Sequence, residues 1–154
     1  MVNNPREAIR QQLSQISPQE YFPLAQRACL LGIQKSDFID EEAPSVALQN
    51  VASNRITPDY QRYFSGYTAG TDEQYLVGHG WQQEGKPVDD ELVTAQFERA
   101  LVTMAVNELV QGIDPSTGEF DGDIDKLTEI FYNLGSTDFG SELLARVLPG
   151  LNLK

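Results

Sequence analysis

The sequence predicts an all-α fold, a single compact bundle-like domain of about five to seven helices that spans residues 1–154. Helix-start signals, in which Ser, Thr, Asn or Asp precedes Pro or an acidic residue, recur along the chain. Apolar residues follow these signals at spacings of three and four, whereas the alternation typical of strands is scarce. The chain has 154 residues, 40% of them hydrophobic, so it can bury one sizeable core. It contains no internal repeat or linker-like tract that would divide it.

The first third of the chain predicts three helices. Asn4-Pro5-Arg6-Glu7 starts the first, because it joins a capping side chain to Pro at the first helical position. Ser17-Pro18-Gln19-Glu20 has the pattern of a capping box. Since Pro23 follows so closely, we expect a short turn and then a helix over about 23–33. Pro44-Ser45 leads into a short third helix through Val51.

An aromatic helix is predicted to begin at Thr57-Pro58-Asp59. Four aromatic residues recur at i, i+3, i+4 and i+7 and so share one face: Tyr60, Tyr63, Phe64 and Tyr67. Such a face packs into the core, anchors a partner protein or lines a ligand site. Stacking on nucleobases is disfavoured, because Arg55 and Arg62 are the only basic residues nearby in the sequence.

The segment after the aromatic helix is predicted to be broken. Gly66 and Gly70 are expected to end that helix, and Thr71-Asp72-Glu73-Gln74 to cap a short second helix to about Val77. The residues that follow, including 78–81, are expected to form a loop. His79 and Trp81 lie in this loop beside glycines, and they are the candidates for binding a small ligand.

The strongest predicted element is a long central helix near 90–111. Its start is acidic, at Asp89-Asp90-Glu91, where the helix dipole favours negative charge. Its apolar stripe is broad enough for the buried spine of the domain, and Gly112 suits its C-terminal end.

The last part of the chain predicts a turn and two helices. Asp114-Pro115-Ser116-Thr117-Gly118 has the residues of a tight turn, which can close a short hairpin over 113–120. Asp123 or a neighbour is expected to cap a helix through Leu134. Ser136 or Thr137 is expected to cap the final helix, which Pro149-Gly150 ends.

The charge is strongly negative and unevenly distributed. The formal net charge is −12, and residues 72–138 hold fifteen acidic and three basic side chains. This charge argues against nucleic acid or an anionic membrane as a direct partner, and it favours a protein with a basic surface. Many of the acids fit helix starts or turns, but six do not: Glu84, Glu98, Glu108, Glu119, Asp121 and Glu129. If these six converge, they mark a docking site; if they scatter, the charge serves solubility.

The N-terminal segment is basic by contrast. Arg6 and Arg10 lie four residues apart on one side of the first predicted helix. The ordinary interpretation is a solvated helix face; the alternatives are that the two arginines orient self-association or pair with the domain's own acids.

No motif predicts a catalytic residue, a metal site or a cofactor. The chain lacks G-x-S-x-G, P-loop, G-x-G-x-x-G and H-E-x-x-H patterns. The acidic loop 114–125 fails as an EF-hand in the registers that start at Asp114 and Asp121. Cys29 lies in an apolar helix, where a buried thiol with no chemical role is the expected outcome. No signal peptide or membrane span is recognisable, and we expect a cytoplasmic protein.

Three functions remain open at this level. The favoured one is a non-enzymatic helical protein–protein interaction module, an adaptor or a subunit of a larger assembly, for which homo-oligomers also qualify. The second is an acidic decoy that mimics nucleic acid and inhibits a basic nucleic-acid-binding protein, which needs carboxylates along one face. The third is a small-ligand protein or enzyme with a site near 78–81.

Overall fold

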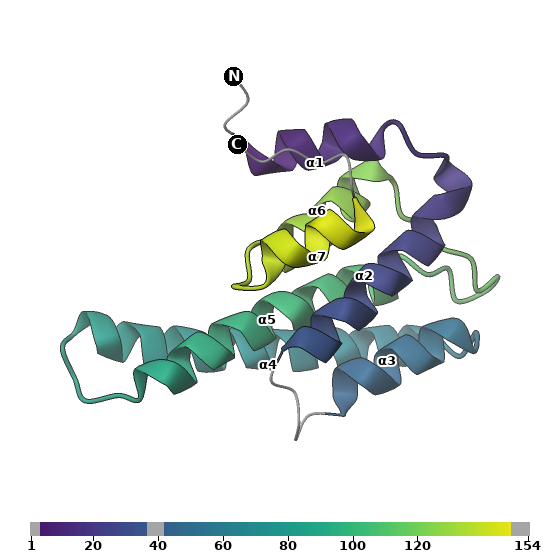
Figure 1. Cartoon of the computed structure of the whole chain (residues 1–154). Helices are drawn as coiled ribbons and strands as arrows, with labels where there is room; N and C mark the ends of the chain where they lie inside the picture. Colours follow the sequence, from purple (N-terminus) through teal and green to yellow (C-terminus); the bar gives the residue numbers. More distant parts are fainter. Residues whose placement is uncertain (1–3, 37–41, 149–154) are drawn as a thin grey trace.

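A computed structural model describes residues 4–36 and 42–148, and every element of regular secondary structure within these ranges is a helix, which confirms the predicted all-α fold class (Figure 1). The described elements, in chain order, are α1 Pro5–Leu13, the 3₁₀ turn η1 Pro18–Glu20, α2 Tyr21–Lys35, α3 Ala43–Ala52, α4 Pro58–Gln83, α5 Asp90–Gln111, α6 Ile124–Gly135 and α7 Gly140–Val147.

Four of the predicted helix starts are confirmed by their capping hydrogen bonds. The side chains of Asn4, Thr57, Asp89 and Asp123 each accept a backbone N–H at the start of their helices. The capping box at Ser17 is wrong, because Ser17 makes no side-chain cap bond and η1 runs directly into α2.

The predicted break in the middle of α4 is also wrong. One helix continues through Gly66, Gly70 and the 78–81 segment as far as Gln83. The Thr71 hydroxyl does not cap a new helix but donates to the Thr68 carbonyl at 2.8 Å inside α4. Each glycine costs a helix only about 1 kcal/mol relative to Ala, and packing against α5 along the whole length of α4 outweighs this cost.

The long helix α5 is the spine of the fold, as predicted. It contacts α4, α6, α2 and α3, and its C-terminal half is buried among them. Leu109 of α5 and Phe131 of α6 are both fully buried in the shared core. In Figure 1, α1, α6 and α7 lie together on one side of α5, and α3 and α4 lie on the other.

The turn after α5 forms as predicted. Ile113 and Phe120 make one isolated antiparallel bridge, and Gly118 adopts the positive φ of 76° that the turn requires.

The start of the last helix differs from the prediction. The Thr137 hydroxyl donates to the Leu134 carbonyl at 2.7 Å, and α7 begins at Gly140 with no side-chain cap. Pro149-Gly150 lies outside the described residues.

Candidate interaction surface

The end of α4 and the start of α5 form a two-helix arm, residues 72–99, that extends beyond the rest of the bundle. Figure 1 shows it projecting away from α1, α6 and α7. Of these 28 residues, Val93 is the only buried one. The rest of the described chain, which we call the base, holds the remaining core. The arm therefore presents most of its side chains to solvent on two paired helices.

Contacts along the inner side of the arm hold its two helices together. Tyr75 packs on Phe97 with ring centroids 4.9 Å apart, and His79 stacks on Tyr75 at 5.3 Å. A Cβ at Gly78 would lie 3.0 Å from Val93 Cγ2, so the absence of a side chain at Gly78 allows this close approach. His79 therefore belongs to an aromatic row inside a helix, and the 78–81 segment is not the loop that the ligand-site prediction assumed.

Large apolar side chains lie on the outside of the arm, about half exposed. The exposed fractions are 55% for Leu76, 50% for Val77, 48% for Trp81 and 55% for Leu92. These four are most of the large hydrophobic side chains exposed in the described part of the chain; the others are Leu30, Val46 and Tyr63. Single exposed apolar residues are ordinary, but a group of four on one projection indicates an interaction site.

Trp81 and Leu92 lie on the same flank of the arm. The Arg99 guanidinium donates to the Gln74 side-chain oxygen and so joins α5 to α4 on this flank. Trp81 follows Gln74 by seven residues, and Leu92 precedes Arg99 by seven, which is close to two helical turns in each case. The apolar surface therefore continues from α4 across to α5.

The outer side of α4 also contains glycines that the fold does not explain. A Cβ added at Gly66, Gly70 or Gly80 would meet nothing within 4 Å. None of the three has a positive φ, since the described glycines of that kind are Gly85 and Gly118. Neither packing against residues 4–36 and 42–148 nor backbone conformation requires a glycine at these three positions.

The predicted aromatic face divides between core and surface. Phe64 is fully buried, and Tyr60 and Tyr67 are half-buried and pack against the core. Tyr63 is 56% exposed and touches Tyr60 at a centroid distance of 5.7 Å. Only Tyr63 of the four is thus available to a partner as a largely free ring.

The six unexplained acids are distributed over the α4 C-cap, α5, the 113–123 turn and α6. Three pair with bases of their own chain: Glu84 with Lys86 at 2.8 Å, Glu108 with Lys126 at 3.3 Å and Glu129 with Arg6 at 2.9 Å. Glu98 lies beside the α6–α7 connection, where burial and then the nearby Asp138 raise its pKa. Glu119 and Asp121 line a cavity.

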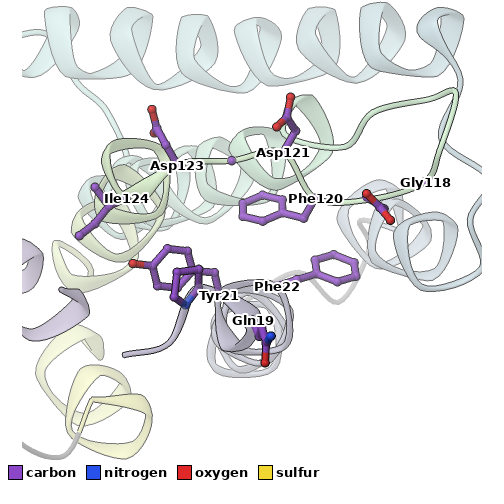
Figure 2. Close-up of a pocket in the computed structure, with 11 residues that line it drawn as sticks. Gln19, Tyr21, Phe22, Gly118, Phe120, Asp121, Asp123 and Ile124 are labelled. Atoms are coloured by element: carbon purple, nitrogen blue, oxygen red, sulfur yellow. The ribbon is translucent and has the colours of Figure 1, made fainter. Parts of the chain in front are cut away.

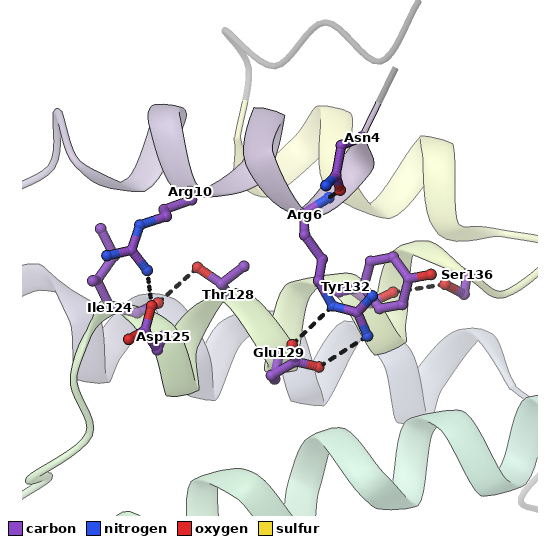
Figure 3. A network of polar contacts seen from close by, with 9 residues as sticks. All are labelled: Asn4, Arg6, Arg10, Ile124, Asp125, Thr128, Glu129, Tyr132 and Ser136. Carbon is purple, nitrogen blue, oxygen red and sulfur yellow. Dashed lines mark hydrogen bonds and ion pairs between the residues drawn. The ribbon is translucent and has the colours of Figure 1, made fainter. Parts of the chain in front are cut away.

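The basic N-terminal helix pairs with the domain's own acids (Figure 3). Arg6 bonds Glu129, and Arg10 forms an ion pair with Asp125 one turn away on α6. The Arg6 guanidinium also lies 3.8 Å above the Tyr132 ring centroid. These contacts fasten α1 to α6, so the two arginines are already engaged within the chain.

A cavity of about 930 Å³ lies between the start of α2 and the 118–124 segment (Figure 2). Phe22 and Phe120 stack across it with centroids 5.8 Å apart. In Figure 2 the carboxylates of Asp121 and Asp123 point away from the side where Tyr21 and Phe22 lie. Asp123 is also occupied as a helix cap, accepting the Lys126 N–H at 2.9 Å. Neither carboxylate is placed as the desolvated group that acid–base catalysis uses. His79 and Trp81 do not line this cavity.

The remaining candidates for a chemical role are Cys29 and possible metal ligands. Cys29 is fully buried, and burial raises the pKa of its thiol to about 12, which keeps it protonated and unreactive at neutral pH. Among residues 4–36 and 42–148, no three His, Cys, Asp or Glu side chains are grouped to hold a metal ion. No helix in those ranges combines the length and the apolar character that a bilayer crossing requires.

Comparison with known protein families, characterised proteins and solved structures finds no match for this chain. Among the large apolar residues exposed on the arm, the sequence analysis selected Trp81 but missed Leu76, Val77 and Leu92. A usable signal was present, because residues 74–83 carry no charged side chain in a strongly acidic chain.

Proposed function

We propose that the protein is a non-enzymatic helical interaction module whose arm docks onto another protein. The observation that supports this most is the group of half-exposed apolar side chains Leu76, Val77, Trp81 and Leu92 on a projecting helix pair. Burying such side chains releases about 25 cal/mol for each Å² of apolar surface removed from water. Trp is also the residue type most enriched where binding energy is concentrated.

The structure of the arm suits this role. The inner contacts of Tyr75, Phe97 and Val93 hold the two helices in one arrangement, so little conformational freedom is lost when a partner binds. The arm also lies away from α1, α6 and α7, which leaves room for a partner around it (Figure 1). A cytoplasmic location remains part of this proposal.

The decoy function receives less support. Mimicry of nucleic acid needs unpaired carboxylates in a row, whereas Glu84, Glu108 and Glu129 each contact a base of their own chain. The ligand-binding function loses its predicted loop, since His79 and Trp81 lie in a continuous helix. The apolar arm is the feature that remains without a role in the fold.

Site-specific photo-crosslinking tests the proposal. The photoreactive residue p-benzoylphenylalanine is placed at Val77 on the arm, which is 50% exposed, and, as a matched control, at Leu30 on α2, which is 49% exposed. Both variants are irradiated as purified protein and in extract of the source cells. We expect intermolecular adducts at Val77 well above those at Leu30. Equal yields at the two positions, or no intermolecular adduct at Val77, would contradict the proposal.

A further inference from the structure

We infer that the partner of the arm is a second copy of this chain, bound antiparallel along one stripe of α4. The inference rests on the proposed function, because it names the occupant of the same surface. The stripe consists of six exposed residues at spacings of three and four: Tyr63, Gly66, Gly70, Gln74, Val77 and Trp81. These spacings keep the residues on one side of an α-helix and give a seam about 27 Å long.

The stripe carries no charge, and this favours a second copy of the chain as its partner. The six residues are uncharged in a chain whose net charge is −12. Two copies of so acidic a protein repel each other wherever their acids meet, so they can associate only through a surface without charge. A basic partner would instead be drawn to the acids around 84–91 at the tip of the arm.

Large and small residues along the stripe make it complementary to itself. A two-fold axis midway between residues 73 and 74 reverses one α4 against the other. This register places Trp81 opposite Gly66 of the second copy and Val77 opposite Gly70, and the symmetry repeats both contacts. At each of these four places a bulky side chain meets a position that has none. The Tyr63 rings then lie at the two ends of the seam.

This arrangement gives the unexplained glycines a role. Gly66 and Gly70 have open space around them within the chain, and each costs α4 about 1 kcal/mol relative to Ala. In the antiparallel pair their missing side chains allow the two helices to approach and receive Val77 and Trp81. Gly80, which is equally open, lies off the stripe and provides a natural control.

The contact is small and partly opposed by charge. A single helix pair of this length is at the low end of stable interfaces, so we expect a weak, concentration-dependent dimer of folded monomers. Glu73 lies beside the stripe near the two-fold axis, and the two Glu73 carboxylates come to the same edge of the seam. Salt screens this repulsion, so association should tighten as salt rises, opposite to a complex held by charge.

Sedimentation velocity over a range of protein and salt concentrations tests the inference. We compare the wild type with the double variant G66A/G70A and with Gly80→Ala. The double variant should associate at least tenfold more weakly while its thermal stability rises, because Ala favours the helix. Gly80→Ala should also raise stability but leave association unchanged. A wild type that stays monomeric at millimolar concentration and high salt, or a double variant that associates like the wild type, overturns the inference.

Disulfide trapping tests the register. A cysteine at Gln74 lies beside the two-fold axis, whereas cysteines at Tyr63 of the two copies lie about 31 Å apart in the antiparallel arrangement. Cys29 is buried and does not compete. We expect Gln74→Cys to form linked dimers under mild oxidation and Tyr63→Cys not to. Linkage at both positions indicates parallel pairing, and linkage at neither indicates another surface; either result overturns the antiparallel arrangement.

The photo-crosslinking at Val77, which belongs to the stripe, separates this inference from the proposed function. Adducts with the mass of two copies of the chain support both. Adducts with other proteins, together with a monomeric wild type, overturn self-association and leave the interaction module standing. The absence of any intermolecular adduct overturns both.

Discussion

Apolar side chains form a buried core in the base of this protein, whereas apolar side chains on the arm face solvent. In the base, the apolar side chains of α5 and α6 face inward and are fully buried, Leu109 and Phe131 among them. In the arm, α4 and α5 continue as a pair, but only Val93 is buried and Trp81 lies half exposed. The same two helices therefore contribute a core at one end and an uncovered apolar surface at the other. A folded domain does not need that surface, which is why we assign it to a partner.

The largest expected difference between base and arm is in the free energy of unfolding lost when a large aromatic side chain is removed. Phe131→Ala in the base should lower the free energy of unfolding by about 3–5 kcal/mol, because it leaves a cavity in a close-packed core. Trp81→Ala on the arm should change it by less than about 0.5 kcal/mol, because no such cavity forms at the surface. Urea denaturation at low protein concentration measures both. A loss at Trp81 as large as that at Phe131 would mean that Trp81 belongs to the core.

A matched pair of glycines gives the next largest difference. A Cβ at Gly32 in the base would lie 2.6 Å from Leu134 Cδ2, which is fully buried, so Gly32→Ala should cost about 1–3 kcal/mol. Gly66→Ala meets open space and should instead stabilise the monomer by about 0.5–1 kcal/mol. Thermal unfolding of the two variants checks the opposite signs. Destabilisation by Gly66→Ala would show that its surroundings are not open.

Hydrogen exchange should separate the two regions without any substitution. Amides of residues 72–99 have few buried contacts around them, so local opening should expose them more easily than amides in the C-terminal half of α5 and in α6. At low protein concentration we expect the arm to exchange faster by at least tenfold. Uniform protection along α5 would contradict the division into base and arm.

The smallest expected effect lies at the junction of the two regions, at Glu98. Burial, followed by the charge of Asp138, raises the pKa of Glu98 above 4.5. A carboxyl with a raised pKa binds its proton more tightly in the folded state, so this contribution to stability declines as pH rises through the window just above 4.5. Solvent screens this effect because Glu98 is only partly buried, so Glu98→Gln should be more stable than wild type at pH 7 by no more than a few tenths of a kcal/mol. Denaturation at pH 7 and pH 4 checks whether the advantage disappears in acid.

The sequence predicted those parts of the fold that depend on local interactions. The caps at Asn4, Thr57, Asp89 and Asp123 were recognisable because each side chain bonds a backbone N–H within three residues. The continuity of α4 was not recognisable from the sequence, because glycines normally weaken a helix. The contacts that compensate for them come from α5, such as that of Phe97 with Tyr75.

The candidate site depends still more on distant contacts. Glu129 looked like a free acid until the fold brought Arg6 to it from 123 positions away. Leu76 and Val77 have the composition of core residues, and only the projection of the arm beyond the base shows that nothing in the described chain covers them. Trp81 was selected for a ligand loop, whereas the structure places it on an outer helical flank.

The fluorescence of Trp81 tests whether two copies of the chain pair along α4. It is the only tryptophan in the chain, it is 48% exposed, and it lies at one end of the proposed seam. As protein concentration rises from low micromolar to millimolar, we expect the emission maximum to move to shorter wavelength as the ring leaves water. G66A/G70A should shift this transition to higher concentration. An emission maximum that stays constant over the whole range would contradict the claim that two copies pair along α4 through Trp81.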